Sequence, residues 1–285
     1  MIQYNPKNWF SLIFQFHRSD TFRKLFWLIL SIGVYTALIV LFEKHVFSIK
    51  STNVIHSLLG FILSLLLVFR TNTAYDRWWD GRRLLGNLVN SFRSFTHKID
   101  TFLTLKEEKL ETFSYIQNFT ISFEAHLSGN HNHEKMNKTT HLNEHLEKSM
   151  HIPNLTANEL YHFVERKRKD GTLNDIQFLA LDADLKEIVA TIGGCERIKN
   201  TPIPYSYSMF IKKFIFVYIM TLPIFLAQDF GFVLIPLTMF VFYALVSIEM
   251  LAEEIEDPFN GDVNDLPLKE ICINIQTNSK ETLNK

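Results

Sequence analysis

The sequence predicts an all-α integral membrane protein with four transmembrane helices and a helical cytosolic region. The sequence contains four apolar runs, and the first, Leu25–Phe42, comes close to the roughly 20 residues that a helix needs to cross a bilayer core. Between the second and third runs, apolar residues instead recur at three- and four-residue intervals, as they do in amphipathic helices. Of the 285 residues, 47% are hydrophobic and 26 are Phe, which is rich for a soluble protein.

The first two runs, Leu25–Phe42 and Val54–Phe69, are joined by the short polar turn Glu43–Asn53 and predict a hairpin. Basic residues lie beyond both of its far ends. They are Arg18, Arg23 and Lys24 before the first run, and Arg70, Arg77, Arg82 and Arg83 after the second. Because basic residues favour the cytoplasmic side of a membrane, both far ends are expected in the cytoplasm.

The stretch Ser57–Arg83 joins the second apolar run to a block of Arg, Asp and Trp with no Pro between them. It predicts one helix that leaves the membrane and continues into water. Along this helix Phe61, Leu65 and Phe69 follow one another at four-residue spacing and form a bulky apolar ridge. The ridge has two interpretations. It packs against lipid or other helices, or several copies of it surround an axis and gate ions by dewetting.

The cytosolic region is expected to be helical. The amphipathic pattern continues directly after Arg83 and returns at Leu110–Leu127, Asn158–Arg168 and Asp175–Ile192. Asp170-Gly171 and Gly193-Gly194 are expected to end the last two of these helices, and Asn174 is expected to cap the start of the helix at Asp175–Ile192.

A histidine-rich segment, residues 126–151, interrupts the helices. Its most polar part, Gly129–His151, predicts a loop or a short irregular helix and contains His131, His133, His141, His145 and His151. His141 and His145 would share one helical face and could bind a metal ion. Since no carboxylate arrangement or Cys partner lies nearby, a solvated surface loop is favoured. The sequence assigns no role to the segment.

Pro202 and Pro204 stop the preceding helix and direct the chain towards a second hairpin. Its apolar runs, Phe214–Ala227 and Phe232–Met250, are separated only by Gln228–Gly231, so an antiparallel arrangement is expected.

The exit from the fourth run is acidic and contains Glu249, Glu253, Glu254, Glu256 and Asp257. A di-metal bundle would need Glu-x-x-His pairs, which these runs lack. Pairing with the arginines that follow the second run, at the membrane boundary, is favoured instead.

These segments divide the chain into four expected parts. They are residues 1–83 with the first hairpin, 84–200 with the cytosolic helices, 201–251 with the second hairpin, and 252–285 as a C-terminal cytosolic segment.

Several function classes are disfavoured. Sequences typical of hydrolases, phosphate-binding loops and zinc proteases do not occur, so the protein is not expected to be an enzyme. With 29 Lys+Arg against 30 Asp+Glu, the charge balance does not indicate nucleic-acid binding. The two cysteines, Cys195 and Cys272, are far apart in sequence and are expected to be reduced structural thiols.

Three blocks of the sequence resemble the bestrophin family, specifically its bacterial branch. They are FRTNTAYDRWWDGRRLLG after the second run, GCERIKNTPIP before the third, and LAEEIEDPFNGDVNDLPL after the fourth. They occur in the order and at the spacing of the family, and the resemblance covers nearly the whole chain.

The resemblance implies a homopentameric ion channel around a central pore, in the cell inner membrane, with both termini cytoplasmic and no required cofactor. Its second membrane helix would line the pore, with Phe61, Leu65 and Phe69 at the hydrophobic neck and Ile176 at the cytosolic aperture. Animal members pass chloride and other small anions, whereas bacterial relatives can prefer cations. Leu65 is aliphatic where animal members carry an aromatic residue, so the preferred small monovalent ion stays open.

The resemblance also bears on calcium binding. Animal bestrophins hold Ca²⁺ with backbone carbonyls and an acidic run after a Pro-Phe pair, and here Asp262 and Asp265 match two of those carboxylates. Because the residues between them are not acidic, calcium control is expected to be weak or absent.

The alternative to a channel is a membrane-anchored helical scaffold or signalling protein that does not conduct.

Overall fold

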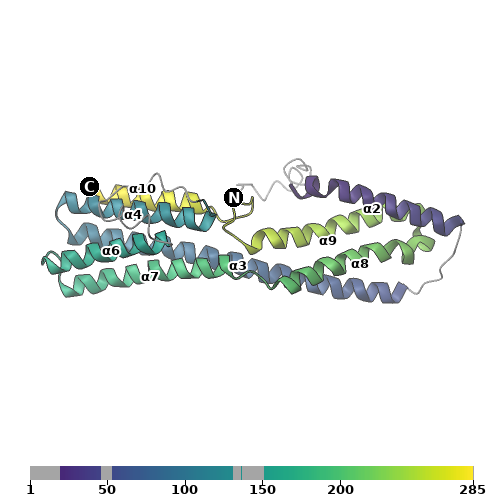
Figure 1. Ribbon diagram of the computed structural model, residues 1–285, viewed down its shortest axis with the longest axis horizontal. Coiled ribbons are helices and arrows are strands. Elements are labelled where there is room, and N and C mark those ends of the chain that lie inside the picture. The colour runs from purple at the N-terminus through teal and green to yellow at the C-terminus, as the bar shows by residue number, and fades with distance from the viewer. Residues whose placement is uncertain (1–19, 46–52, 131–135, 137–150, 285) are drawn as a thin grey trace. The chain divides into compact units, whose positions relative to one another are not determined.

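The computed structural model describes residues 20–45, 53–130, 136 and 151–284. Within these residues every regular element is a helix, as predicted (Figure 1). The elements are α2 (Asp20–His45), α3 (Asn53–Phe102), α4 (Lys106–Ser128), α6 (Ile152–Lys169), α7 (Asp175–Asn200), α8 (Tyr205–Phe230), the 3-10 turn η2 (Gly231–Val233), α9 (Leu234–Glu256) and α10 (Leu268–Leu283).

The chain forms two compact units. The apolar unit comprises Ile2–Asp76 and Pro202–Glu256, and the polar unit comprises Arg77–Thr201 and Asp257–Lys285. The 50-residue helix α3 contributes to both, because it is unbroken from Asn53 to Phe102. The expected helix that continues past the apolar run is therefore present and is longer than the stretch that predicted it.

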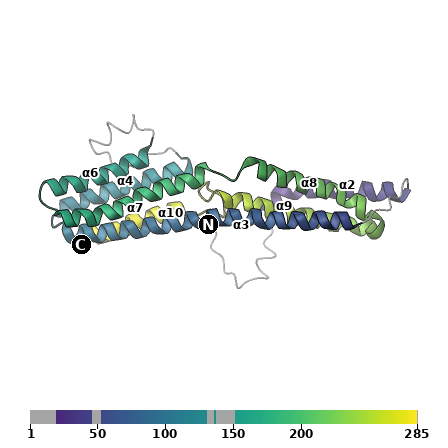
Figure 2. The same cartoon turned by 90° about the horizontal axis from the view of Figure 1, so that it is seen from below.

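Among the residues that the structure describes, three segments have the length and apolar composition of membrane spans. They are Thr21–Lys44, Val54–Phe102 and Tyr205–Glu256, with mean hydropathies of 2.5, 2.0 and 2.2. The third segment contains both α8 and α9, which pack side by side and are joined by η2 (Figures 1 and 2). The turn begins at Gly231, whose φ of 51° favours glycine.

Close packing holds the apolar unit together. On α3, Leu63 and Leu67 are buried in a cluster with the α8 residues Ile211, Ile215 and Ile219. Between α2 and α9, a Cβ placed on Gly33 would lie 2.8 Å from Met239 Sδ. Because the two helices approach so closely at this point, a larger side chain at Gly33 would force Met239 to move.

The polar unit has a core of stacked aromatic and aliphatic side chains. Its largest fully buried members include Phe92 and Phe95 of α3, Phe119 and Phe123 of α4, and Phe163 of α6. The ring centroids of Phe92 and Phe119 are 5.1 Å apart, within the range of favourable aromatic pairs. This core joins α3, α4, α6, α7 and α10 in one hydrophobic cluster.

Local signals explain the turn between α6 and α7. Gly171 has a φ of 82°, a conformation that suits glycine after a helix end. Asn174 then caps α7 in a capping box, in which its side chain accepts from Gln177 N at 2.8 Å and Gln177 Oε1 accepts from Asn174 N at 2.9 Å. Both the stop and the predicted cap are confirmed.

The predicted end of α7 at Gly193-Gly194 is wrong, since the helix continues to Asn200. A Cβ on Gly194 would lie 2.8 Å from Leu84 Cδ2 of α3. Gly194 therefore permits close helix packing inside a continuous helix. The sequence analysis also missed α10, which packs against α4 through buried residues at helical spacing, among them Cys272, Ile275 and Ser279.

Candidate functional site

The apolar ridge on α3 is exposed in the single chain. Phe61, Leu65 and Phe69 retain 67%, 46% and 55% of their accessible surface. An exposed row of large apolar side chains needs a nonaqueous or oligomeric environment, because water solvates it poorly. In this chain the row lies within an apolar segment of membrane-spanning length.

The opposite face of α3 is buried in the apolar unit. His56, Leu63, Leu67 and Arg70 are each at most 3% exposed. At about 100° per residue, these four residues centre roughly 180° from the ridge. Packing within the unit therefore turns Phe61, Leu65 and Phe69 directly away from α8 and leaves them for lipid or for other copies of the chain.

Arg70, immediately after the ridge, anchors α3 to α9. Its Nη2 lies 2.6 Å from Glu256 Oε2, and its Nε lies 3.7 Å from Glu249 Oε2. The guanidinium is 1% exposed, so these pairs are shielded from water. The predicted pairing of the acidic exit with an arginine after the second run is confirmed.

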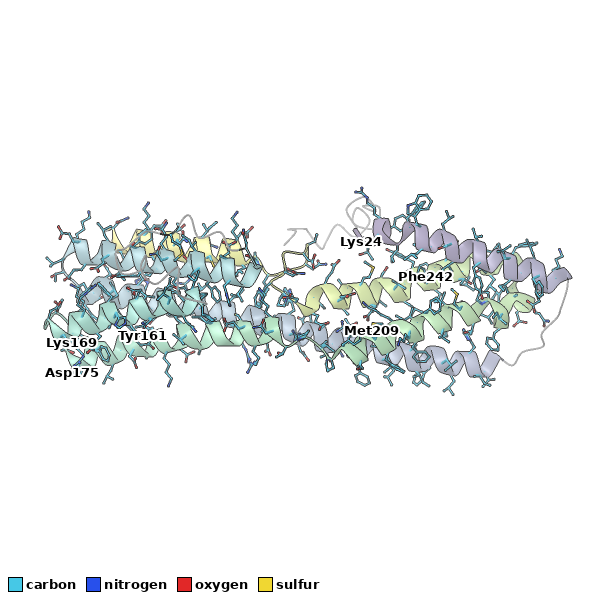
Figure 3. All side chains as sticks on the ribbon, viewed as in Figure 1. Lys24, Tyr161, Lys169, Asp175, Met209 and Phe242 are labelled. Carbon is cyan, nitrogen blue, oxygen red and sulfur yellow. The ribbon has the colours of Figure 1, made fainter. Side chains whose placement is uncertain are left out.

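Ile176 occupies the first turn of α7 and is 80% exposed. The capping box fixes the helix start one residue before it, at Asp175, which lies beside the end of α6 (Figure 3). Asp175 Oδ1 also accepts from Arg168 Nη1 at 3.2 Å. The capping box and the Arg168–Asp175 ion pair therefore fix the start of α7, and the aliphatic side chain of Ile176 is exposed there.

The two calcium candidates are unlike each other. Asp262 is exposed, whereas Asp265 is 4% exposed and its Oδ2 accepts from Gly261 N at 2.5 Å and Asp262 N at 2.8 Å. Burial raises the pKa of Asp265 to about 6. One carboxylate oxygen of Asp265, Oδ2, is therefore occupied by hydrogen bonds within its own loop.

The loop around Asp265 is held against α3 within the polar unit. Trp78 Nε1 donates to Asn264 O at 3.1 Å, and a Cβ on Gly81 would lie 3.2 Å from the Phe259 ring. A calcium site needs six to eight oxygens, and here the two matched carboxylates supply one free buried oxygen and one exposed group. These two carboxylates alone therefore supply too few ligands for a calcium site.

The sequence analysis missed a cluster of His126, His151 and Glu196. Both imidazole Nε2 atoms lie within hydrogen-bond distance of Glu196 Oε1 in the polar unit. No spacing signal could have found it, because the residues are 25 and 45 positions apart and lie on separate elements. His141 and His145, the pair weighed from sequence, lie outside the described residues.

A family model described as bacterial/fungal bestrophin protein matches residues 1–281. The chain belongs to the bacterial and fungal bestrophins. Relatives of this bestrophin include the voltage-dependent anion channel-forming protein alr2987 of Nostoc, 29% identical over 279 residues, which cover 95% of this chain and 91% of the relative. Another is the voltage-dependent anion channel-forming protein YneE of Escherichia coli K12, 30% identical over 283 residues, with 95% and 90% covered.

Solved structures support the fold. The crystal structure of a bacterial bestrophin homologue from Klebsiella pneumoniae superposes with a TM-score of 0.85 at 24% identity, covering 92% of this chain and 99% of that one. A crystal structure of the same homologue with a single substitution gives a TM-score of 0.84 at 25% identity, with 90% and 97% covered. The predicted family and the all-helical bestrophin fold are confirmed, and this bestrophin is a membrane protein.

Proposed function

We propose that this bestrophin is an anion channel whose pore is lined by α3. Relatives similar over 95% of the chain are named voltage-dependent anion channel-forming proteins. The observation that carries the proposal is the ridge of Phe61, Leu65 and Phe69, which packing turns away from the rest of its unit. In a ring of copies it becomes a narrow apolar tube that dewets easily and so gates ions.

The proposed channel is a homopentamer in the inner membrane. Each subunit crosses the bilayer with α2, the first part of α3, α8 and α9, and both termini are cytoplasmic. Five copies of the ridge then form three apolar rings about 6 Å apart along the axis. Ile176 forms a second constriction, the cytosolic aperture.

The channel is proposed to work without an enzymatic step and without a required cofactor. Calcium control is proposed to be weak, because Asp265 already accepts two N–H groups of its own loop and Asp262 is exposed.

Two measurements test the function. Mass determination in mild detergent should give a particle of five chains, whereas a stable monomer would favour a nonconducting scaffold. In planar bilayers under a KCl gradient, the reversal potential should approach the equilibrium potential of chloride. A potential near that of potassium would assign a cation channel, and a folded pentamer without current would remove conduction altogether.

A further inference from the structure

Three side chains with metal-binding chemistry converge in the polar unit. His126 lies in the last turn of α4, His151 immediately precedes α6, and Glu196 lies on α7. His126 Nε2 is 2.7 Å and His151 Nε2 is 2.5 Å from Glu196 Oε1. One ligand atom from each of the three residues lies within 4.8 Å of the others.

We propose that His126, His151 and Glu196 bind a divalent transition-metal ion of the zinc class. Two imidazoles and one carboxylate are a donor set that zinc accepts, and three protein ligands leave its fourth position to water. In a tetrahedral site the ligand atoms are about 3.3 Å apart. To admit the ion, Glu196 Oε1 would therefore move away from each imidazole by less than about 1 Å. The two imidazole nitrogens, up to 4.8 Å apart, would approach each other by up to about 1.5 Å. This site does not depend on the channel proposal.

The burial of the cluster suits an exchangeable ion. The three side chains are 32%, 33% and 22% exposed, so an ion and its water can reach them. The adjacent thiol of Cys195 is not part of the ligand set, because it is fully buried in the hydrophobic core of the polar unit. The carboxylate of Glu196 is the anionic ligand.

One nearby cation limits the affinity. Lys199 Nζ donates to His126 O at 2.9 Å and to Leu127 O at 2.8 Å, one helical turn beyond Glu196. These bonds fix the end of α4 and hold the His126 backbone in place. Its positive charge opposes the metal ion, while its two hydrogen bonds position the His126 ligand.

The hydrogen bonds of His151 define the proton change that metal binding requires. Its Nδ1 accepts from Asn154 N at 3.2 Å and caps α6, so in the neutral ring Nε2 carries the proton and donates to Glu196. A metal ion can bond to Nε2 only after the proton leaves this nitrogen, and the neutral ring would then carry the proton on Nδ1, which can no longer accept from Asn154 N. Binding therefore exchanges the cap at Asn154 for a metal bond.

The position of the cluster gives the ion a structural role. His126 and His151 stand at the two ends of the histidine-rich segment 126–151, and Glu196 ties both to α7. An ion held by all three links α4, α6 and α7. Since a preformed site exists only in the folded chain, zinc binding should stabilise the polar unit.

The test is a zinc titration of the full-length protein in detergent after removal of metals by a chelator. Calorimetry should give one zinc per chain, and zinc should raise the melting temperature. His126→Gln and Glu196→Gln should each weaken binding by at least about tenfold and abolish the thermal shift. Cobalt(II) bound to the wild type should show the intense visible absorption of a four-coordinate ion.

The matched control replaces His131, His133, His141 and His145 together with Ser, which removes four imidazoles and leaves the proposed ligands. This variant should bind zinc as the wild type does. Circular dichroism without metal checks that each variant is folded, and two separate ligand variants guard against a single folding failure. Unchanged zinc affinity in folded His126→Gln and Glu196→Gln, or loss of binding only in the four-histidine control, would overturn the site. The cluster would then be a shared hydrogen bond and nothing more.

Discussion

Arg70 and Glu256 form a shielded ion pair at the end of the apolar ridge, with Nη2 and Oε2 separated by 2.6 Å. The second oxygen of Glu256 accepts from the backbone N–H of Ile203 at 2.6 Å. One carboxylate therefore joins α3 to the start of the second hairpin, and a second buried carboxylate, that of Glu249, faces the same guanidinium at 3.7 Å.

Arg70→Met should destabilise the protein strongly, because it removes the cation that faces the buried carboxylate of Glu249 and the partly buried carboxylate of Glu256. Removal of one partner from a buried pair typically costs about 3–5 kcal/mol. Lys212→Met is the control, since its bridge to Glu253 is exposed and should be worth about 1 kcal/mol or less. Chemical unfolding in detergent measures both variants. Equal losses in the two would show that the Arg70 cluster does not anchor α3.

The proposed topology predicts which positions react with a membrane-impermeant thiol reagent in intact cells. A cysteine at Gln228, in the last turn of α8 before η2, should react from outside. Gly231 is a poorer site for the substitution because its φ is positive. A cysteine at the exposed Ile176 should react only after the membrane is permeabilised. Cys195 and Cys272 are buried, so the background should be low. The reverse labelling pattern would show that the protein has the opposite orientation in the membrane.

Asp265 should make stability depend on pH. Its pKa is about 6 in the folded chain, above the ordinary 3.8, so the folded state holds the proton more tightly than the unfolded state. The resulting stabilisation is complete below about pH 4 and is lost as the pH rises through about 6. The nearby carboxylates of Asp257 and Asp262 add to the rise in the pKa.

The free energy of unfolding should therefore be greater at about pH 5 than at about pH 8. Asp265→Asn should reduce this difference, while Asp262→Asn, at an exposed position, should largely preserve it. An unchanged pH dependence in folded Asp265→Asn would show that this carboxyl does not titrate as its burial implies.

The membrane helices were predictable because apolar runs are local signals. Asn174 was equally readable, since a cap acts within three residues. The predicted helix end at Gly193-Gly194 was wrong, because Gly194 allows close packing against Leu84, which lies 110 positions away in the sequence. The cluster of His126, His151 and Glu196 could not be predicted either, because its residues are far apart in the sequence. Only the packing of α4, α6 and α7 brings it together.

Ile176→Ala should change the relative passage of small and large anions more than it changes gating. The residue is 80% exposed, so truncation should alter stability by only about 0.5 kcal/mol or less. Bi-ionic reversal potentials of reconstituted wild type and variant measure the effect. Leu179→Ala, at an exposed leucine one turn further along α7, is the control. Equal changes of the reversal potential in the two variants would show that Ile176 does not form the aperture.

Truncation of Phe61, Leu65 and Phe69 together to Ala should raise the single-channel conductance. Five smaller side chains at each ring widen the apolar tube, so water enters it and an ion keeps more of its hydration shell. Phe216 on α8 and Phe240 on α9 provide the matched control, because they are 64% and 66% exposed, like Phe61, but lie on other helices.

Truncation of these two control residues to Ala should leave the conductance unchanged, since the proposed pentamer turns them towards lipid or a neighbouring subunit. Mass measurement confirms that each variant is still a folded pentamer before currents are compared. If the triple variant conducts like the wild type, the ridge is a packing surface and α3 does not form the neck. If the control raises conductance as much as the triple variant does, the effect comes from general loosening of the apolar unit. Only a rise confined to the triple variant assigns all three side chains to the pore.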